Sequence, residues 1–511
     1  MIEGEELLKM KKDARPAADQ WRPQYHFSAP VNWLNDPNGM VYHNGIYHLM
    51  YQYHPGGIEW GPMHWGHATS RDLVHWEHRP VALYPDENGM IFSGCAVVDH
   101  KDSSGFFEGK PGLVAVFTHH TVQPDTGTVC QSQSLAYSRD EGQTWIKYAD
   151  NPVLKEPSLP DFRDPKVFWH DTEQCWVMVL AAGDHIRFYA SRNLKEWSYT
   201  GEFGRQQGSH HGVWECPDLF ELPVRNRPRQ SRWVLVVSIG GLPQDIEGSR
   251  TQYFLGRFEG GCFIGEEPVE KVRWMDGGRD NYAGVTWSDA PDGRRIWLGW
   301  MSNWKYAALL PAERFRGAMT LPRELELHHQ GGELQLRQLP VSELAGLRAG
   351  SALWEEIAVS PQTPFKPDCA AELLELLLEW EWSGMVPGPD SESAYEAGIR
   401  LWTQDGQETR IGIDARQGEL YIDRTASGES SFHPDFACRH SMKLAPGTGK
   451  SPKLRIWADR ISVEVFAGEG ELAMTDLIYP AAGPFRIEVY TIGGNIRIRT
   501  LNMHKLHINQ R

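Results

Sequence analysis

The chain has 511 residues, more than one hydrophobic core usually serves, so two domains are the starting expectation. Its formal net charge is −16 and its pI is near 5.7, which argues against a nucleic-acid partner or an anionic membrane because both favour basic surfaces. The most apolar runs, around residues 176–182 and 233–239, are too short to span a bilayer and are typical of buried strands.

Residues 1–20 read as an N-terminal extension that mixes charges of both signs and lacks the apolar core of a secretory signal. The seven cysteines are widely spread, odd in number and without CxxC spacing, a pattern typical of reduced thiols. Together these features predict a cytoplasmic protein. A secreted protein whose leader has been trimmed is the competing interpretation.

Residues 21–338 contain a repeated local pattern, SR followed a few residues later by Trp, at Ser70–Trp76, Ser138–Trp145 and Ser191–Trp197. Each copy follows a short apolar or aromatic run and is predicted to be a turn between strands. Helical periodicity is nearly absent in this region, whereas short β-rich runs recur. About five four-stranded units would fill it, which predicts a five-bladed β-propeller whose axis gathers loops from every blade.

Residues 339–352 lose the aromatic density of the preceding region and are predicted to form a short helical linker. Beyond them, residues 353–511 contain alternating runs separated by Gly-containing turns, such as 461–467 and 485–490, which predict an antiparallel β-sandwich. The run 373–382 fits helix or strand by periodicity, and its surroundings favour a strand. The predicted fold class is all-β, a five-bladed propeller followed by a C-terminal sandwich.

Three carboxylates occur in similar surroundings. Asp36 lies in WLNDPNG, where Pro37 and Gly39 are typical turn formers, so a turn is predicted to hold this carboxylate out into a pocket. Asp164 lies in FRDPKVF and Glu215 in WECPDLF, each just before a short apolar strand. Their separations along the chain place the three on different blades, so all can meet at one end of the axis.

Such a group has a defined chemical use. Three carboxylates in one aromatic-lined pocket repel one another, and the repulsion is relieved if one stays protonated near neutral pH. One ionised carboxylate as nucleophile and one carboxylic acid as proton donor, about 5 to 5.5 Å apart, are what a retaining glycosidase needs. Arg163 directly precedes Asp164 in the sequence, and its positive charge would favour the ionised form of that carboxylate.

The three motifs, in this order and with these spacings, resemble glycoside hydrolase family 32, the invertase, levanase and inulinase group of β-fructofuranosidases. The resemblance covers about residues 20 to 505. Further matching segments are YQYHP (51–55), WGPMHWGHATSRDLVHW (60–76), FSG (92–94), GWMSNWKYA (299–307), RGAMTLPREL (316–325) and SVEVFAGEGELAMTDLIYP (462–480).

The resemblance implies a five-bladed propeller and a retaining double displacement at the anomeric carbon of fructose. No metal or other cofactor is expected, because the histidines lack the spacings of metal ligands. By the same resemblance Asp36 is the nucleophile, Glu215 the acid/base and Asp164 the stabiliser of the transition state. The implied contacts of the terminal fructosyl unit are Asn35, Gln52, Trp60, Phe92, Ser93, Arg163, Asp280, Tyr282 and Trp304.

The chain departs from the family pattern at three places, which leaves preferences beyond the first fructose open. DNYA carries Asn281 where Phe is common, SIGGLPQ (238–244) replaces a loop that commonly carries Asn, Pro and Gly, and Cys95 stands where Ser is usual. Other chemistry is disfavoured. Cys216 has no His and Asn partners for a nucleophilic site, and the 21 histidines include no HExxH motif.

The predicted activity is exo-hydrolysis of terminal β-D-fructofuranosyl residues of sucrose, fructo-oligosaccharides and fructans through a covalent intermediate. Three alternatives on the same site stay open: a fructosyltransferase, a levan- or inulin-specific fructanase and a sucrose-6-phosphate hydrolase. A non-catalytic fructan-binding propeller is the alternative from another class, although all three carboxylates are present. The expected partners are fructose-containing sugars, with no nucleic acid or membrane, for a monomer or homo-oligomer.

Overall fold

The computed structural model describes residues 20–227, 229–242, 244–384, 395–444 and 451–507. The predicted N-terminal extension lies outside these ranges apart from Gln20. Strands dominate the described residues, and the all-β prediction is confirmed. No helix in these ranges has the length and apolar character needed to cross a membrane.

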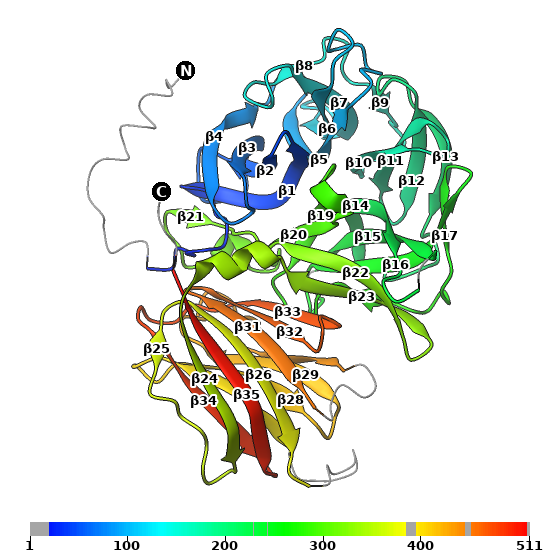
Figure 1. Ribbon diagram of the computed structural model, residues 1–511. Helices are drawn as coiled ribbons and strands as arrows, with labels where there is room; N and C mark the ends of the chain where they lie inside the picture. Colours follow the sequence, from blue (N-terminus) through cyan, green and yellow to red (C-terminus); the bar gives the residue numbers. More distant parts are fainter. Residues whose placement is uncertain (1–19, 228, 243, 385–394, 445–450, 508–511) are drawn as a thin grey trace.

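The N-terminal part forms five sheets that stand around one axis (Figure 1). In spatial order the first contains β21 (Phe315–Arg316), β1 (Asn32–His43), β2 (Ile46–His54), β3 (His64–Ser70) and β4 (Trp76–Leu83). The second contains β5 (Met90–Asp99), β6 (Gly112–Val122), β7 (Val129–Ser138) and β8 (Ile146–Lys147), with β9 (Leu154–Lys155) also paired to β7. The third contains β10 (Phe162–His170), β11 (Cys175–Ala182), β12 (Ile186–Ser191) and β13 (Ser198–Phe203).

The fourth sheet contains β14 (Gly212–Pro223), β15 (Ser231–Gly241), β16 (Arg250–Glu259) and β17 (Cys262–Gly265), with β18 (Arg273–Trp274) paired to β16. The fifth contains β19 (Tyr282–Thr286), β20 (Ile296–Trp300), β22 (Arg323–Gln330) and β23 (Glu333–Pro340). The 3-10 turns η2 (Pro291–Gly293) and η3 (Ala307–Leu309) lie in its connections. The five-bladed propeller is therefore confirmed, and β1, β5, β10, β14 and β19 lie nearest its axis (Figure 1).

The repeated SR…W segments are turns, as predicted. Each joins the third strand of its sheet to the fourth, in the first three sheets. The indole of the closing Trp donates a hydrogen bond to a carbonyl three residues earlier, from Trp76 to Leu73 (3.1 Å), from Trp145 to Gly142 (3.2 Å) and from Trp197 to Leu194 (2.8 Å). The repeat is thus a structural device that closes the blade edge.

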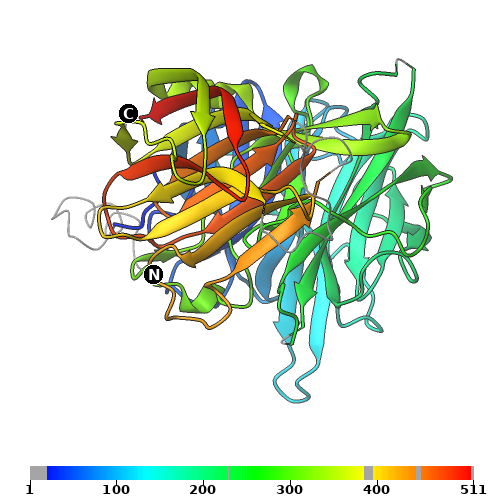
Figure 2. The ribbon, with the colours of Figure 1, turned by 90° about the horizontal axis from the view of Figure 1, so that it is seen from below.

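The C-terminal part is a sandwich of two six-stranded antiparallel sheets, below the propeller in Figure 1 and in front of it in Figure 2. One contains β24 (Arg348–Val359), β35 (Ile496–Leu506), β26 (Leu374–Trp382), β31 (Lys453–Asp459), β32 (Ser462–Ala467) and β33 (Leu472–Leu477). The other contains β25 (Ala370–Ala371), β34 (Phe485–Ile492), β27 (Glu396–Trp402), β28 (Glu408–Asp414), β29 (Glu419–Ala426) and β30 (Arg439–Lys443). The apolar faces of both sheets form one core, and residues 373–382 contribute a strand, as predicted.

The predicted linker is mostly regular structure. Residues 339–352 contain the end of β23, the 3-10 helix η4 (Ser342–Leu347) and the start of β24. The sandwich sheet therefore begins at Arg348, inside the predicted linker. The domain boundaries otherwise stay predictions.

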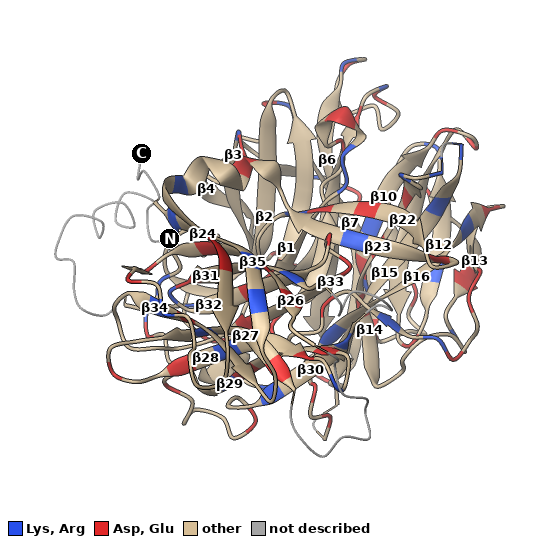
Figure 3. Cartoon of the chain, turned by 60° about the horizontal axis from the view of Figure 1, so that its bottom comes forward, with Lys and Arg blue, Asp and Glu red and all other residues tan. Residues whose placement is uncertain are grey.

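Buried charges join the two parts. Arg323, on β22, is fully buried and pairs with Asp276 (2.9 Å) and with Glu464 of β32 (2.6 Å). Glu464 also contacts His26 (2.8 Å), whose other ring nitrogen contacts Asp459 (2.8 Å). Because breaking a buried pair leaves an unpaired charge in the interior, this network fixes the sandwich against the propeller. Along the ribbon, acidic and basic residues are interspersed (Figure 3).

Candidate active site

Every strand nearest the axis has an irregularity in its pairing toward its N-terminal end. The register shifts between Leu34 and Pro37, Ile91 and Gly94, Arg163 and Lys166, Glu215 and Asp218, and Tyr282 and Val285. A β-bulge turns side chains out of the regular alternation, and bulges are common next to active sites. Asp164 (φ 64°) and Cys216 (φ 45°) have the positive φ that such a distortion demands. Five bulges thus converge on one end of the axis.

Asp36 therefore does not lie in a turn, as the sequence predicted. WLNDPNG is part of strand β1, and the turn-forming residues produce a bulge within it. Gly39 is required there, because its φ is 51° and an added Cβ would lie 2.6 Å from the sulfur of Met50.

Four of these bulges, those of β1, β5, β10 and β14, border a pocket of about 360 Å³, a volume in the range of small-molecule sites. It is lined by Asn35, Asp36, Gln52, Trp60, Phe92, Ser93, His120, Val129, Gln131, Asp161, Arg163, Asp164, Glu215 and Trp304. The three predicted carboxylates, from β1, β10 and β14, are thus brought together in one pocket.

Asp36 is held by three donors. The Ser93 hydroxyl donates to Oδ2 (2.7 Å), the Asn35 amide donates to Oδ1 (3.1 Å), and the Cys216 thiol lies 3.5 Å from Oδ2. Burial raises the pKa of Asp36, and these hydrogen bonds act in the opposite direction because they favour the ionised form. Asn35 is fixed by the indole of Trp33, which donates to its Oδ1 (2.7 Å).

Glu215 is held between a cation and a phenol. Arg163 Nη2 lies 2.9 Å from Oε1, and the Tyr282 hydroxyl donates to Oε2. Arg163 also pairs with Asp161 (2.5 Å) and lies 3.9 Å from Asp164. The arginine is thus closer to Glu215 than to Asp164, the partner that the sequence indicated.

Asp164 is the most isolated of the three from solvent. Its Oδ2 accepts from the backbone N–H of Cys216 (3.0 Å), and its own N–H donates to Thr118 (3.0 Å). Burial raises the pKa of this carboxyl, Arg163 opposes the shift, and the charges of Glu215 and Asp36 add to it. The repulsion predicted among the three carboxylates is therefore present in the structure.

Aromatic rings form the walls of the pocket. Trp60 is 44% exposed and packs edge-on against Phe92, and Phe92 stacks on His120 with centroids 4.2 Å apart. Trp304 is 37% exposed on the other side and stacks on the buried Trp33. Flat apolar walls above a floor of carboxylates suit a sugar, which presents both C–H faces and hydroxyls.

Two models of glycosyl hydrolase family 32 match the chain, the N-terminal domain over residues 26–340 and the C-terminal domain over residues 343–505. The chain belongs to glycoside hydrolase family 32. The protein is therefore a glycoside hydrolase, with the activity of an exo-acting β-fructofuranosidase.

Relatives of the family match over the whole chain. A levanase of Bacillus subtilis is 50% identical over 493 residues, covering 96% of this chain and 71% of its own length, and a levanase of Bacillus sp. strain L7 is 38% identical, with 52% of its length covered. An extracellular exo-inulinase of Aspergillus awamori has a solved structure at 36% identity and a TM-score of 0.85, covering 95% of this chain and 98% of that chain. A β-fructofuranosidase of Schwanniomyces occidentalis complexed with fructosyl-erythritol superposes with a TM-score of 0.86 at 30% identity, covering 97% and 100%.

Two residues of the family pattern lie outside the pocket wall. Asp280 is fully buried, accepts from Tyr306 (2.6 Å) and pairs with Arg424 of the sandwich (2.6 Å), so the prediction that it contacts the sugar is wrong. Asp280 instead joins the propeller to the sandwich. Tyr282 is also buried and reaches the site only through its hydroxyl on Glu215.

The departures from the family pattern differ in their distance from the site. Asn281 points to Asp276 (2.9 Å) near the domain interface, and Cys95 is buried with its sulfur 3.1 Å from the N–H of Val167. Neither lines the pocket. Of segment 238–244, residues 238–241 are the end of β15 rather than a loop, and a Cβ added to Gly240 would lie 3.2 Å from Glu215 Oε2, so this end of the strand packs directly on the carboxylate.

The sequence interpretation missed four pocket residues: His120, Val129, Gln131 and Asp161. Asp161 lies two residues before Arg163 and was identifiable from that spacing. The other three come from β6 and β7, whose sequences carry no motif and reach the pocket only because the second blade faces the axis. Among the described residues no group of three or more His, Cys, Asp or Glu is arranged to hold a metal ion.

Proposed function

We propose that Asp36 is the nucleophile, Glu215 the general acid and base, and Asp164 the residue that holds fructosyl hydroxyls in a retaining reaction. The observation that carries the proposal is the convergence of the three carboxylates, from three blades, in one aromatic-walled pocket. A pair of carboxyl groups flanking the scissile bond is what retaining glycosidases require.

In the first step, an oxygen of ionised Asp36 forms a bond to the anomeric carbon while the bond from that carbon to the leaving-group oxygen breaks. Protonated Glu215 gives its proton to the departing oxygen, and the fructosyl unit stays on Asp36 as an ester. The Ser93 and Asn35 donors orient Asp36 and favour its ionised form before the attack. The ionised Asp164 accepts hydrogen bonds from sugar hydroxyls and stabilises positive charge developing on the ring.

In the second step, the Glu215 carboxylate takes a proton from a water molecule, and the resulting nucleophile attacks the anomeric carbon from the face that the leaving group vacated. The ester bond breaks and Asp36 leaves as a carboxylate. Two displacements restore the β configuration. Arg163 and the Tyr282 hydroxyl, both bonded to Glu215, hold it in place for both proton transfers.

Substitution at the two reacting carboxylates tests the roles separately. Asp36→Asn is expected to abolish turnover of sucrose and of a nitrophenyl fructoside. Glu215→Gln is expected to lose sucrose hydrolysis but to retain much more activity on the nitrophenyl fructoside, whose leaving group departs as a stable anion and needs no proton. Glu221→Gln, an exposed position on the same strand, is the matched control and is expected to behave as wild type. Sucrose turnover near the wild-type rate by Asp36→Asn would refute the assignment.

For the substrate, we propose sucrose and short fructo-oligosaccharides with wider activity on fructans, one terminal fructosyl unit at a time. The support is a pocket sized for a small sugar and relatives named levanase and exo-inulinase. Product analysis on sucrose, inulin-type oligomers, levan-type oligomers and sucrose phosphate, side by side, tests the range. Fructosyl transfer uses the same covalent intermediate, so the same analysis measures the ratio of transfer products to free fructose.

We also propose that the protein works in the cytoplasm. The support is its seven free cysteines, none of them in a disulfide, which suit a reducing compartment. Some relatives carry names that call them extracellular. Measuring activity in the cell and in the culture medium of the producing organism decides between the two, and activity mainly in the medium would refute the proposal.

A further inference from the structure

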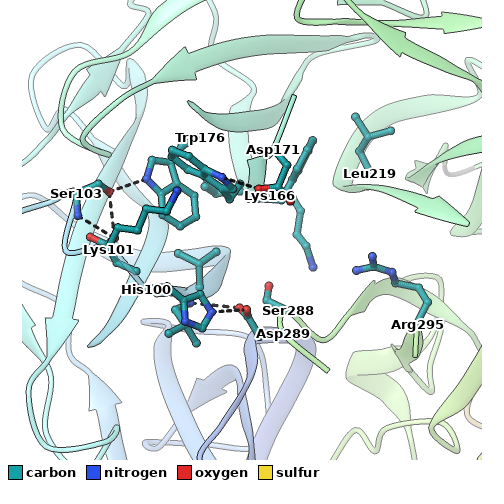
Figure 4. A pocket seen from close by; sticks show the side chains of 16 residues that line it. His100, Lys101, Ser103, Lys166, Asp171, Trp176, Leu219, Ser288, Asp289 and Arg295 are labelled. Carbon is teal, nitrogen blue, oxygen red and sulfur yellow. Dashed lines mark hydrogen bonds and ion pairs between the residues drawn. The ribbon is translucent and has the colours of Figure 1, made fainter. Parts of the chain in front are cut away.

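A second cavity lies toward the opposite end of the propeller axis from the active site, as the strand positions of the two sets of lining residues show. Figure 4 shows the side chains that line it. Its volume is about 400 Å³, again in the range of small-molecule sites. It is lined by the C-terminal parts of β5 and β10, by Leu219 of β14 and by residues that follow β19. Two of these strands, β10 and β14, carry Asp164 and Glu215 toward their N-terminal ends. On β10, Asp164 faces the active site, while Lys166 and the following residues line this cavity.

The acidic side chains around the cavity have partners. Asp99 accepts from the N–H groups of Ser103 (2.9 Å) and Ser104 (2.8 Å). Asp289 pairs with His100 (2.9 Å), and Asp171 accepts from the indole of Trp169 (3.1 Å). These carboxylates are therefore not placed to bind an added cation.

Two of the cationic side chains also have partners. Lys166 donates to the carbonyl of Thr286 (2.6 Å) and pairs with Asp218 (3.2 Å). Lys101 lies over the ring of Trp169 and contacts Gln174 (3.4 Å).

Arg295 differs from both. Its guanidinium points into the cavity (Figure 4), and among the described residues it has no side-chain hydrogen bond or ion pair. Its Nε is buried and has no acceptor among these residues. The guanidinium carbon lies 5.2 Å from the centre of the Phe220 ring. Burial lowers the pKa of Arg295, and the charges of Asp218 and Asp289 only partly offset this.

A buried donor without an acceptor is expensive, and a guanidinium presents its N–H groups in the planar fork that matches an oxyanion. The cavity also has apolar lining, which includes Val98, Leu219 and Trp176. The Ser288 hydroxyl points inward (Figure 4). We propose that this cavity is a binding site for a small organic anion, whose phosphate or carboxylate group pairs with Arg295 and whose compact body fills the remaining volume. The inference does not depend on the proposed catalytic roles.

Titration calorimetry on the full chain tests the site, with glucose 6-phosphate and gluconate as anionic probes and glucose as the uncharged control. Saturating fructose is present throughout, so that the active site is occupied. We expect saturable binding of at least one anion and none of glucose. If the natural ligand is a phosphate ester, glucose 6-phosphate should bind more tightly than gluconate. If it is a carboxylate, gluconate should bind more tightly.

Two neighbouring variants locate the binding. Arg295→Gln is expected to weaken the anion by about tenfold or more, because a charge-assisted bidentate contact is lost. Arg294→Gln is the matched control, since Arg294 pairs with Glu324 and Glu343 outside the cavity, and it is expected to bind as wild type. Arg295→Gln removes a half-buried charge that has no ion-pair partner among the described residues, so we expect it to fold with unchanged or higher thermal stability.

The proposal fails if neither anion binds saturably, or if Arg295→Gln binds as tightly as wild type. A second measurement needs only the wild-type protein. Crystals soaked in selenate should show an anomalous peak within hydrogen-bond distance of the Arg295 guanidinium. A soaked crystal without a peak at Arg295 would overturn the site independently of any variant.

Discussion

Removing the hydrogen bond from Ser93 to Asp36 is expected to slow sucrose hydrolysis. Ser93 Oγ lies 2.7 Å from Oδ2 of Asp36, and of the three side-chain donors it contributes most to lowering the pKa of this carboxyl. A hydrogen bond to a charged group is worth about 1.5–3 kcal/mol. Ser93→Ala should therefore lower kcat/KM for sucrose by about 10- to 150-fold, if the bond is fully used in the transition state.

The pH dependence has a definite sign. Asp36 must be ionised to attack, and losing the Ser93 donor raises the pKa of its carboxyl, so the acidic limb of the kcat/KM profile should move to higher pH. Asn35→Ala and Cys216→Ala should move the limb in the same direction by successively smaller amounts, following the order of their contributions.

The assay is initial rates of sucrose hydrolysis across pH, with circular dichroism to show that each variant is folded. Ser191→Ala is the control, because Ser191 ends β12 at the blade edge and, among the described residues, its hydroxyl hydrogen-bonds with Asn193 alone. An unchanged acidic limb in Ser93→Ala, with the fold intact, would refute the view that this donor keeps the nucleophile ionised.

Three further predictions concern the walls and the interface. Trp60→Ala should raise KM for fructo-oligosaccharides more than it lowers kcat, as steady-state kinetics would show, because the exposed indole forms a wall of the pocket and is itself neither an acid nor a base; an unchanged KM would contradict this. Arg323→Met should lower the unfolding free energy in urea by about 3–5 kcal/mol, because Glu464 and Asp276 are left buried without their cation; a loss below about 1 kcal/mol would show that they are otherwise compensated. Burial opposes protonation of His26, but its hydrogen bonds to Asp459 and Glu464 outweigh burial and raise its pKa to about 9. In the unfolded chain the pKa of His26 is about 6.5. The stability that protonated His26 contributes to the fold is therefore fully present below that pH and is lost as pH rises through about 9. Urea titrations across this range should show a steeper loss in wild type than in His26→Gln, and equal slopes would contradict the assignment.

The sequence was sufficient for the parts of the fold that local patterns encode. The SR…W segments predicted turns, and the structure shows that each is closed by its own tryptophan within three residues. Some sandwich strands follow from alternation, as in β35, where exposed Arg497 and Arg499 alternate with buried Ile496 and Ile498. Both signals act over a few residues and need no tertiary context.

The errors arose where distant residues decide the conformation. WLNDPNG contains typical turn formers, but pairing with β2 keeps it in a strand and converts the turn tendency into a bulge. The family resemblance placed both Asp280 and Tyr282 in the site, yet Arg424, 144 residues away from Asp280, draws Asp280 into the domain interface. Arg163 adjoins Asp164 in the chain, but the bulge in β14 places Glu215 closer to its guanidinium.

The central claim, that Asp36 carries the fructosyl unit between two displacements, is tested most directly by trapping the intermediate. Glu215→Gln should form the ester from a nitrophenyl fructoside quickly and hydrolyse it slowly, because the second step lacks its general base. Peptide mass spectrometry after acid quenching should then find one fructosyl unit on the peptide that contains Asp36. A fructosyl unit on a different peptide, or substrate turnover by this variant without any adduct, would contradict the account.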